Sequence, residues 1–374
     1  MKIQIFICGE GLGHTTRSLA AGKELIKAGH NVQFCAYGYS KEHIEKEGYS
    51  AIKIPSEIKL VGRSGYFDIK DSIEETLKST DILAYPKLLR VIKKGKPDLI
   101  ISDSYFLAVI AGKILRKRVF IILNQTNVKA FFENRGINVK LVGRIVNKFS
   151  DSVLRRVDKI LIPDFLPPFT VCGLNLNFSQ KLLDRVVYTG PLVRQRPSEV
   201  KGLNLKKPHV FSTVGGFGYR ERLFRNILSI AKLQKHIHFT LVAGPNVDVN
   251  VLKEHSKNVE IIPYLNDPFQ YIKSTDMVIA PGGHSTLMEC LSFGKPVLSF
   301  PDIDHSEQEN NVEMIEKLGV GKHMSYLMSD FMITDCIEEM LNDKKIKKNC
   351  KRMEQFAKKL DGAKRVVKMI EGQE

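Results

Sequence analysis

Short hydrophobic runs alternate with longer amphipathic stretches along the first half of the chain. The runs have the length of buried strands and lie at 3–8, 32–36, 99–102, 119–123 and 159–162. Between them, apolar positions recur at helical spacing, as in TTRSLAAGKELIKAG, where Gly29 would end a helix. Strands that alternate with helices predict a parallel sheet that is covered on both faces.

The same alternation begins again after a stretch rich in proline, glycine and lysine. Its hydrophobic runs lie at 210–213, 240–243, 259–262, 277–280 and 297–300. We therefore predict two doubly wound α/β domains with Rossmann-like parallel sheets, residues 1–193 and 208–356, joined by a linker at 194–207. Ligands would bind in a central cleft between the domains, at the carboxyl ends of the strands.

Composition narrows the classes of partner. The chain has 374 residues and a formal net charge of +16, which favours anionic partners such as nucleotide phosphates or an acidic membrane surface. Basic residues are not interleaved with aromatic ones, so we expect no nucleic-acid partner. The six cysteines lack zinc-ligand spacing and C-x-x-C pairs. With no apolar run long enough for a signal peptide or a spanning helix, we expect a cytoplasmic protein that meets a membrane only from its surface.

The first candidate site is the glycine-rich stretch GEGLGH, which follows the first strand. A dinucleotide fingerprint would also need an acidic residue at the end of the second strand, but that strand ends in FCAYG, so a nicotinamide or flavin enzyme is not favoured. His14 is a candidate base because histidine titrates near neutral pH. Asp103 ends a neighbouring strand and could orient it. The alternatives are a histidine packed on its loop and an exposed loop aspartate.

The second candidate site begins at the sequence PGGHSTLMECL. Gly282 and Gly283 follow a strand, and Ser285 and Thr286 open the next helix. Unpaired backbone N–H groups and the helix dipole bind anions at such a point. Glu289, on the same helix, could accept hydrogen bonds from ribose hydroxyls. The alternative is a helix that is merely capped by a polar loop.

A polar stretch, FPDIDHSEQENN, follows the next predicted strand. Glu307 and Gln308 offer acceptors and donors that suit sugar hydroxyls. Asp302 and Asp304 form an Asp-x-Asp pattern that could hold a divalent metal. We give this pattern little weight, because it is short and is followed at once by the pair suited to a sugar, and we expect no metal.

These blocks resemble the nucleotide-sugar-dependent glycosyltransferases of the GT-B fold. The similarity is to the MurG or family 28 branch and to the family 1 UDP-glycosyltransferases, and especially to archaeal and bacterial glycosyltransferase-like proteins. It covers essentially the whole chain and is most specific in GGHSTLMECLSFGKPVLSFP and EQENN. The resemblance implies a hexosyltransferase with a UDP-sugar donor and no cofactor, in which a C-terminal helix at 357–374 packs back on the first domain.

The resemblance also implies roles for single residues. His14 would stand beside the acceptor hydroxyl, Arg194 would bind phosphate, and Tyr264 with Leu265 would pack on uracil. Glu10 departs from the pattern of MurG, and it joins His14 and Asp103 as a catalytic candidate on the acceptor side. The implied donor-binding residues are Gly11, Gly13, Arg194, Gly215, Gly216, Tyr264, Leu265, Gly282, Gly283, His284, Ser285, Thr286, Glu289, Glu307 and Gln308.

The predicted reaction is an inverting, metal-independent transfer of a sugar from a nucleoside diphosphate sugar to a hydroxyl acceptor, for which a lipid-linked molecule or a glycolipid is a candidate. One alternative is an enzyme like the hydrolysing UDP-GlcNAc 2-epimerase, which typically has two adjacent glutamates where this chain has Glu289 followed by Cys290. Another is a non-catalytic protein that binds nucleotide sugars or nucleic acid.

A basic amphipathic stretch at 127–157 is a candidate for membrane contact. Such a helix can lie on an anionic bilayer, and the alternative is a helix that turns its apolar side to the core. The apolar residues of the stretch include Phe131, Phe132, Leu141, Ile145, Val146 and Phe149, and its basic residues include Lys140, Arg144, Lys148, Arg155 and Arg156.

Overall fold

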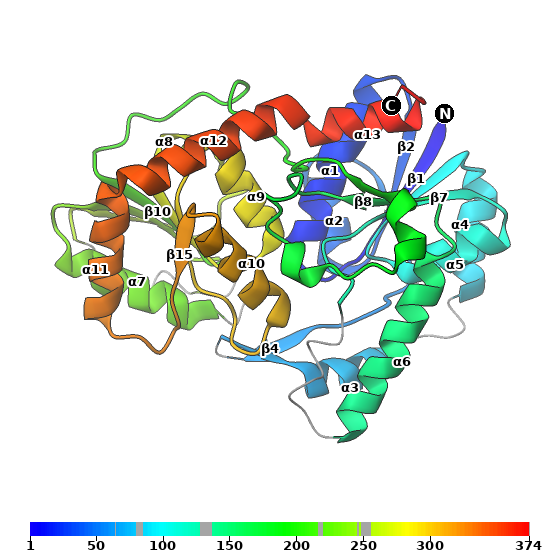
Figure 1. Ribbon diagram of the computed structural model, residues 1–374, viewed down its shortest axis with the longest axis horizontal. Helices are drawn as coiled ribbons and strands as arrows, with labels where there is room; N and C mark the ends of the chain where they lie inside the picture. The colour runs from blue at the N-terminus through cyan, green and yellow to red at the C-terminus, as the bar shows by residue number, and fades with distance from the viewer. Residues whose placement is uncertain are drawn as a thin grey trace. The chain divides into compact units, whose positions relative to one another are not determined.

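A computed structural model describes residues 1–63, 65–79, 85–127, 137–215, 220–244, 247 and 256–373. The chain divides into two compact units (Figure 1). The first unit contains residues 1–61, 68–194 and 360–374, and the second contains residues 62–67 and 195–359.

The first unit is built on a 7-stranded sheet in the order β3-β2-β1-β6-β7-β8-β9. All neighbouring strands of this sheet are parallel. The order reverses between β1 and β6, which is the switch point where doubly wound sheets bind ligands. The strands are β1 Lys2–Ile7, β2 Asn31–Ala36, β3 Ala51–Lys53, β6 Leu99–Asp103, β7 Arg118–Ile122, β8 Lys159–Ile162 and β9 Val186–Tyr188.

Helices cover both faces of this sheet, and alternate side chains of β1 pack in a hydrophobic cluster on each face. Ile3, Ile5 and Ile7 pack in one hydrophobic cluster and Phe6 in the other. Helix α13 contacts α1 on the first of these faces (Figure 1). The helices are α1 Leu12–Lys27, α2 Gly38–Lys46, α3 Ile69–Ser79, α4 Tyr85–Gly95, α5 Phe106–Ile114, α6 Ile137–Leu154 and α13 Gly362–Ile370, with short 3₁₀ helices η3 Gly173–Asn175 and η4 Gln180–Arg185.

The second unit repeats this plan with a 6-stranded parallel sheet in the order β12-β11-β10-β13-β14-β15. Its order reverses between β10 and β13. The strands are β10 His209–Thr213, β11 His238–Val242, β12 Val259–Ile262, β13 Met277–Ala280, β14 Val297–Ser299 and β15 Gly321–His323. The helices are α7 Glu221–Leu233, α8 Phe269–Ser274, α9 His284–Ser292, α10 Ser306–Lys317, α11 Asp330–Asn342 and α12 Lys344–Leu360.

A small hairpin adds a second piece of chain to the second unit. Strands β4 Val61–Arg63 and β5 Tyr66–Asp68 pair with each other, and residues 62–67 cluster with the second unit. There Phe67 N donates to Ile303 O at 2.9 Å, and Ile303 N donates to Gly65 O at 2.9 Å. The hairpin therefore supports the loop that carries Asp302 and Asp304.

The predicted secondary structure is confirmed in both halves. Each of the ten predicted strands is present with ends within two residues of the expected positions. Five strands in the part of the chain that the structure describes were not predicted, and each has three residues: β3, β9 and β15 at edges of the two large sheets, and β4 and β5 of the hairpin. Among the described residues, no helix is both long enough and apolar enough to cross a membrane.

Candidate active site

The first group of candidate residues lies at the switch point of the first unit. Ile7 of β1 stands opposite Asp103 of β6, and Cys8 N continues the pairing by donating to Asp103 O at 3.1 Å. The chain then turns at Gly11, whose φ of 81° lies in the left-handed region that favours glycine. Helix α1 starts at the next residue, so its first turn stands at the end of β6.

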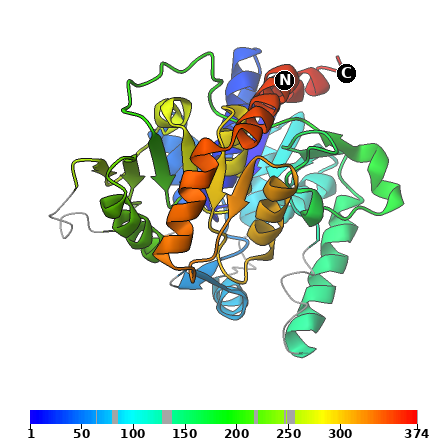
Figure 2. The ribbon, with the colours of Figure 1, turned by 60° about the vertical axis from the view of Figure 1, so that its left-hand side comes forward.

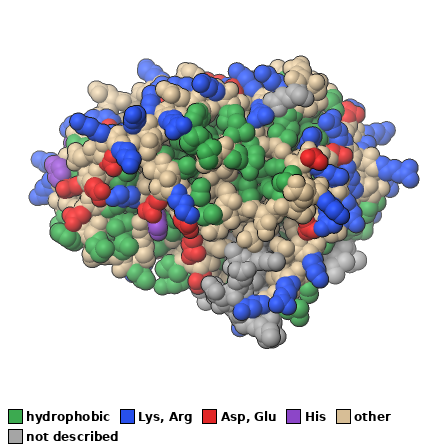
Figure 3. Space-filling view, in the orientation of Figure 1, with side chains coloured by type: hydrophobic (Ala, Val, Ile, Leu, Met, Phe, Trp, Pro, Cys, Tyr) green, Lys and Arg blue, Asp and Glu red, His purple; other side chains and the backbone are tan. Residues whose placement is uncertain are grey.

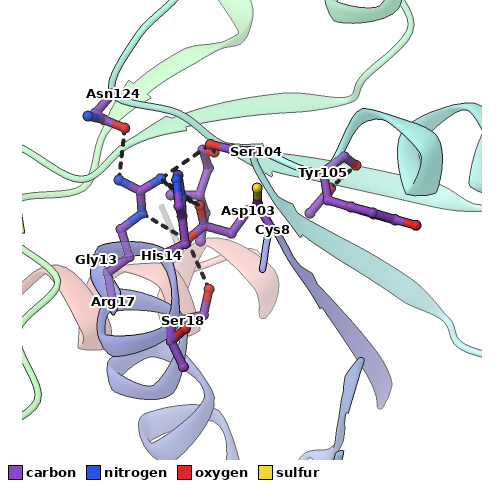
Figure 4. Close-up of polar contacts among 12 residues, drawn as sticks. Cys8, Gly13, His14, Arg17, Ser18, Asp103, Ser104, Tyr105 and Asn124 are labelled. Carbon is purple, nitrogen blue, oxygen red and sulfur yellow. Dashed lines mark hydrogen bonds and ion pairs between the residues drawn. The ribbon is translucent and has the colours of Figure 1, made fainter. Parts of the chain in front are cut away.

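This arrangement brings two predicted residues together. His14 Nδ1 lies 2.8 Å from Asp103 Oδ1 (Figure 4). Asp103 is fully buried, whereas the His14 side chain is 25% exposed. An imidazole whose Nδ1–H donates to a carboxylate presents its other nitrogen, Nε2, as a proton acceptor. The contact is therefore that of a base with its orienting carboxylate, although the catalytic role itself stays a prediction.

Arg17 is the residue of this site that the sequence analysis missed. Its buried guanidinium donates from Nε to Asp103 Oδ2 at 2.8 Å and from Nη2 to Asp103 Oδ1 at 2.5 Å. Nη1 donates to Asn124 Oδ1 at 2.9 Å, so the group lies between β6 and the end of β7 (Figure 4). Arg17 follows His14 by three residues and therefore shares its helix face. That spacing, G-H-x-x-R, was the available signal.

Asp103 stays ionised because of these partners. Burial raises the pKa of its carboxyl, but the charge and hydrogen bonds of Arg17, together with those of His14, outweigh burial and lower the pKa to about 2. Ser18 Oγ adds a hydrogen bond to Asp103 Oδ2 at 2.9 Å. The carboxylate is thus negative over the whole range in which histidine titrates.

Glu10 occupies the same loop but faces another partner. Its Oε2 accepts a hydrogen bond from Leu60 N at 3.1 Å. Burial raises the pKa of Glu10 above its usual range, against the opposing hydrogen bond from Leu60 and the charges of Lys59 and His14. Gly13, the other glycine of this loop, lies within α1, where its carbonyl accepts from Thr16 Oγ1 at 3.2 Å.

The second group of candidates lies at the switch point of the second unit, where β13 leads into α9. A Cβ on Gly282 would lie 2.9 Å from Gln308 O, so only glycine fits there. Gly283 is the N-cap residue of α9 and has open space where a Cβ would stand. Ser285 and Thr286 are half-buried in the first turn. The helix N-terminus can therefore be approached by an anion.

Other predicted residues around this helix start are buried. His284 and Glu289 both lie on α9 with most of their surface covered. Asn311 Nδ2 donates to Gly282 O at 3.0 Å and to Glu307 Oε1 at 3.4 Å. These contacts tie the glycine turn to the first turns of α10, where Glu307 is half-buried.

Asp302 forms the centre of a buried polar cluster beside this turn. Arg220 donates from Nε to Oδ1 at 2.8 Å and from Nη2 to Oδ2 at 2.5 Å. Tyr326 Oη donates to Oδ1 at 3.1 Å, and Gln308 Nε2 donates to Oδ2 at 2.8 Å. Gln308 Oε1 in turn accepts from Asp302 N at 3.0 Å. The structure therefore places the amide of Gln308 on Asp302, and its predicted contact with a donor sugar stays a prediction.

The remaining predicted residues lie at separate places. Gly215 has a φ of 71° and follows β10, while Gly216 lies outside the described residues. Arg194, in the first unit, donates from Nη1 to Glu47 Oε1 at 2.9 Å. Tyr264 and Leu265 follow β12, and Tyr264 is exposed. Their predicted contacts with phosphate and base stay predictions.

Arg220 was the second residue missed by the sequence analysis. Besides Asp302, it donates from Nη1 to Val214 O at 3.0 Å, and so it connects the loop after β10 to the loop after β14. An arginine that follows a glycine-rich stretch is usually interpreted as a solvent-exposed cation, so nothing in the sequence indicated that Arg220 is buried.

Comparison with known proteins shows the family of this chain. Residues 209–366 match the glycosyltransferase family 28 C-terminal domain. A protein of Methanosarcina mazei named an uncharacterized glycosyltransferase is 52% identical over 371 residues, which cover 99% of this chain and 98% of the relative. The chain belongs to the family 28-like glycosyltransferases.

More distant similarities agree with this family. A UDP-N-acetylglucosamine--N-acetylmuramyl-(pentapeptide) pyrophosphoryl-undecaprenol N-acetylglucosamine transferase of Caldicellulosiruptor saccharolyticus is 22% identical, over 96% of this chain and 94% of the relative. The crystal structure of the glycotransferase of kitacinnamycin has a TM-score of 0.74 at 15% identity, and the match covers 100% of this chain and 98% of that chain. At this identity the likeness shows the fold alone. The predictions of a GT-B fold and of a glycosyltransferase are confirmed.

Proposed function

We propose that this glycosyltransferase moves a sugar from a nucleoside diphosphate sugar, with UDP as the nucleotide, to a hydroxyl group of its acceptor with inversion at the anomeric carbon. The observation that carries the proposal is the 2.8 Å contact between His14 and Asp103 at the switch point of the first unit. An inverting transfer needs one base to take the proton of the acceptor hydroxyl, and this pair supplies it.

In the proposed reaction, His14 Nε2 accepts the hydroxyl proton while the acceptor oxygen bonds to the anomeric carbon. The bond from that carbon to the diphosphate breaks, and the diphosphate leaves with the electron pair. A base of this kind contributes on the order of 10²–10⁴-fold to the rate. Asp103 stabilises the positive imidazole that forms, because its carboxylate stays ionised next to Nδ1.

The leaving diphosphate would bind at the start of α9. The open approach at Gly283 and the half-buried Ser285 and Thr286 support this assignment, since backbone N–H groups and the helix dipole favour negative charge there. Metal independence belongs to the same proposal. Its support is that Asp302, the first acid of the Asp-x-Asp pattern, accepts hydrogen bonds from Arg220, Gln308 and Tyr326.

A donor screen tests this function. We expect UDP and UDP-sugars to raise the unfolding temperature of the protein by several degrees at a hundredfold excess over Kd, because such binding adds about 2.7 kcal/mol to its stability. NAD and NADP should have no effect. Glu289→Gln should weaken the UDP response, whereas Glu313→Gln, an exposed change on α10, should leave it unchanged.

The screen separates two errors. If no nucleoside diphosphate shifts the unfolding temperature, the proposed donor class is wrong. If only GDP or TDP does so, the donor class stands and the uracil contact assigned to Tyr264 and Leu265 is wrong.

We further propose that the acceptor is lipid-linked and that α6 holds the enzyme on an anionic membrane surface. Three apolar side chains spaced four residues apart are exposed on this helix: Leu141, Ile145 and Phe149, at 56%, 61% and 48%. In both ribbon views α6 extends away from the sheet of its own unit (Figures 1 and 2). This exposure favours the membrane interpretation of the predicted amphipathic stretch over the core-facing one. Phe131 and Phe132 lie outside the described residues.

The charges beside the apolar row support an anionic membrane as the partner of this surface. Lys140, Arg144 and Lys148 are exposed directly beside the apolar row, and Figure 3 shows basic and hydrophobic side chains together where Figure 1 places α6. Apolar side chains flanked by cations match a bilayer with anionic headgroups, where each basic residue near the surface adds about 1 kcal/mol.

Vesicle binding checks this role. We expect the double variant Arg144→Glu/Lys148→Glu to bind anionic phosphatidylglycerol vesicles more than about tenfold more weakly, and high salt to weaken the wild type in the same way. Lys344→Glu/Lys345→Glu on α12 makes the same change in net charge at another exposed place and should have a much smaller effect. Equal losses in both double variants would mean that only net charge matters and that α6 is not the docking surface.

A further inference from the structure

The buried Arg17 contacts both members of the pair to which we assign the proton transfer. Its guanidinium is bidentate to Asp103, and its Nη2 also lies 2.9 Å from His14 Nδ1. A cation that binds only the carboxylate would have a structural role. A cation that also stands beside the imidazole influences how many protons the pair holds.

Hydrogen-bond counting places the proton of His14. Nδ1 lies 2.8 Å from Asp103 Oδ1 and 2.9 Å from Arg17 Nη2, and a ring nitrogen carries either a hydrogen or an accepting lone pair. The hydrogens of Nη2 have two other acceptors, Asp103 Oδ1 at 2.5 Å and Ser104 Oγ at 3.4 Å. A bond to an ionised carboxylate is the stronger choice. Nδ1–H therefore donates to Asp103, and in the neutral imidazole Nε2 then has the lone pair.

The loss of Arg17 would change this state. Asp103 is fully buried, and burial is the largest single influence on its pKa, which it raises. The charge and hydrogen bonds of Arg17 are the largest influences in the opposite direction. Without them the pair would take up a second proton. In one form the carboxyl of Asp103 is protonated and donates to Nδ1, and the imidazole carries its hydrogen on Nε2. In the other form the carboxyl stays ionised and the imidazole carries hydrogens on both nitrogens. In both forms Nε2 of His14 carries a hydrogen and cannot act as a base.

We propose that Arg17 is a positioning residue that keeps the His14–Asp103 pair at a single proton, held on Nδ1, at neutral pH. The inference rests on the proposed role of His14 as the base. Three charged groups of the first unit interact with His14 in the described part of the chain: Arg17 from α1, Asp103 from β6 and Glu10 from the loop after β1. The carboxylate form of Glu10 carries a negative charge and acts against Arg17.

The test is Arg17→Gln, followed by the pH dependence of sugar transfer and by ¹⁵N NMR of histidine-labelled protein. We expect the acidic limb of the rate profile to move to higher pH by about 1 unit or more, so that transfer falls about tenfold near neutral pH and recovers in alkali. The ¹⁵N signal of an unprotonated Nε2 of His14, identified by its absence in His14→Gln, should be lost at pH 7. Glu10→Gln removes an anion and should move the limb in the opposite direction.

Two further variants separate charge from packing. Arg17→Lys keeps the buried charge but loses the bidentate contact, and we expect a lower rate with the acidic limb and the Nε2 signal unchanged. Lys23→Gln removes an exposed cation from the same helix and should change neither. Thermal unfolding identifies any variant that fails to fold. If Arg17→Gln does not fold, Arg17→Lys still tests the proposal. A second proton on the His14–Asp103 pair of Arg17→Lys at pH 7 would contradict it, because this variant keeps the positive charge.

A loss of transfer in Arg17→Gln that is equal at every pH, with the unprotonated Nε2 signal retained, would overturn the inference and leave Arg17 a purely structural residue. The NMR measurement does not need turnover. If the wild type transferred no sugar while the signal changed as expected, the proposed function would fail and the role of Arg17 would stand.

Discussion

Replacement of His14 by alanine is expected to lower the rate of sugar transfer at least about a hundredfold while donor affinity stays close to that of the wild type. The variant removes the proton acceptor of the first unit, whereas the proposed diphosphate site is built on α9 of the second unit. Transfer at saturating donor and the donor-induced shift in unfolding temperature measure the two quantities separately. The acidic limb of the pH profile should also disappear, because the group that titrates there is absent.

Asp103→Asn should give a smaller loss of the same kind, because the residue only orients the imidazole. His236→Ala, which removes a 65% exposed histidine from the second unit, is the matched control and should transfer at the wild-type rate. Suppose instead that His14→Ala abolishes donor binding or unfolds the domain, with unchanged transfer per folded, donor-bound molecule. His14 would then be a loop-packing residue, and Glu10 would become the leading candidate for the base.

The central strands of both sheets could be predicted because parallel strands buried on both faces are continuous hydrophobic runs. Strand β6 is an example, with all five of its residues buried. Of the four edge strands described for the two large sheets, β3, β9 and β15 could not be predicted in this way, whereas the fourth, β12, was predicted. Strand β3, AIK, is open on one side and half exposed, and β15 consists of glycine, lysine and histidine. Their pairing is set by neighbours distant in sequence, which leaves no local pattern to read.

The candidate sites show the same division. The proximity of His14 and Asp103 could be predicted because both follow strand ends at one edge of a parallel sheet. The roles of Arg17 and Arg220 could not, because a buried arginine is recognised by the carboxylate that it contacts. Those carboxylates lie 86 and 82 residues away along the chain. The contacts of Gln308 with Asp302 were not predicted either, and its contact with a donor sugar stays a prediction.

Arg220→Met is expected to lower the free energy of unfolding by about 3–5 kcal/mol, because it leaves the buried carboxylate of Asp302 without its counter-charge. Arg220 makes two charged hydrogen bonds to Asp302 and a third bond to Val214 O. Donor affinity should fall as well, since the same contacts hold the loops after β10 and β14. Denaturant unfolding with and without UDP measures both effects. Arg225→Met, which breaks an exposed ion pair with Glu221 on α7, should cost less than about 1 kcal/mol.

The pH dependence of the loss in free energy of unfolding in Arg220→Met distinguishes a charge effect from a packing effect. In the wild type, burial raises the pKa of Asp302, but the charge and hydrogen bonds of Arg220 outweigh burial and lower it below the ordinary value. A group with a lowered pKa in the folded state stabilises the fold above its unfolded pKa, about 3.9, and loses that contribution as the pH falls through the folded value. In Arg220→Met, burial would dominate and would raise the pKa of Asp302. Protonation of this carboxyl at low pH would then remove the cost of the buried charge in the variant, whereas in the wild type it removes a stabilising ion pair. The loss in free energy of unfolding should therefore be largest near neutral pH. It should begin to shrink above about pH 4, as the pH falls through the raised pKa of Asp302 in the variant, and shrink further below about pH 4, where the wild type loses its own contribution. Asp302→Asn in the Arg220→Met background should recover part of the loss at pH 7. A deficit that does not change with pH would instead assign the loss to the packing of the arginine side chain.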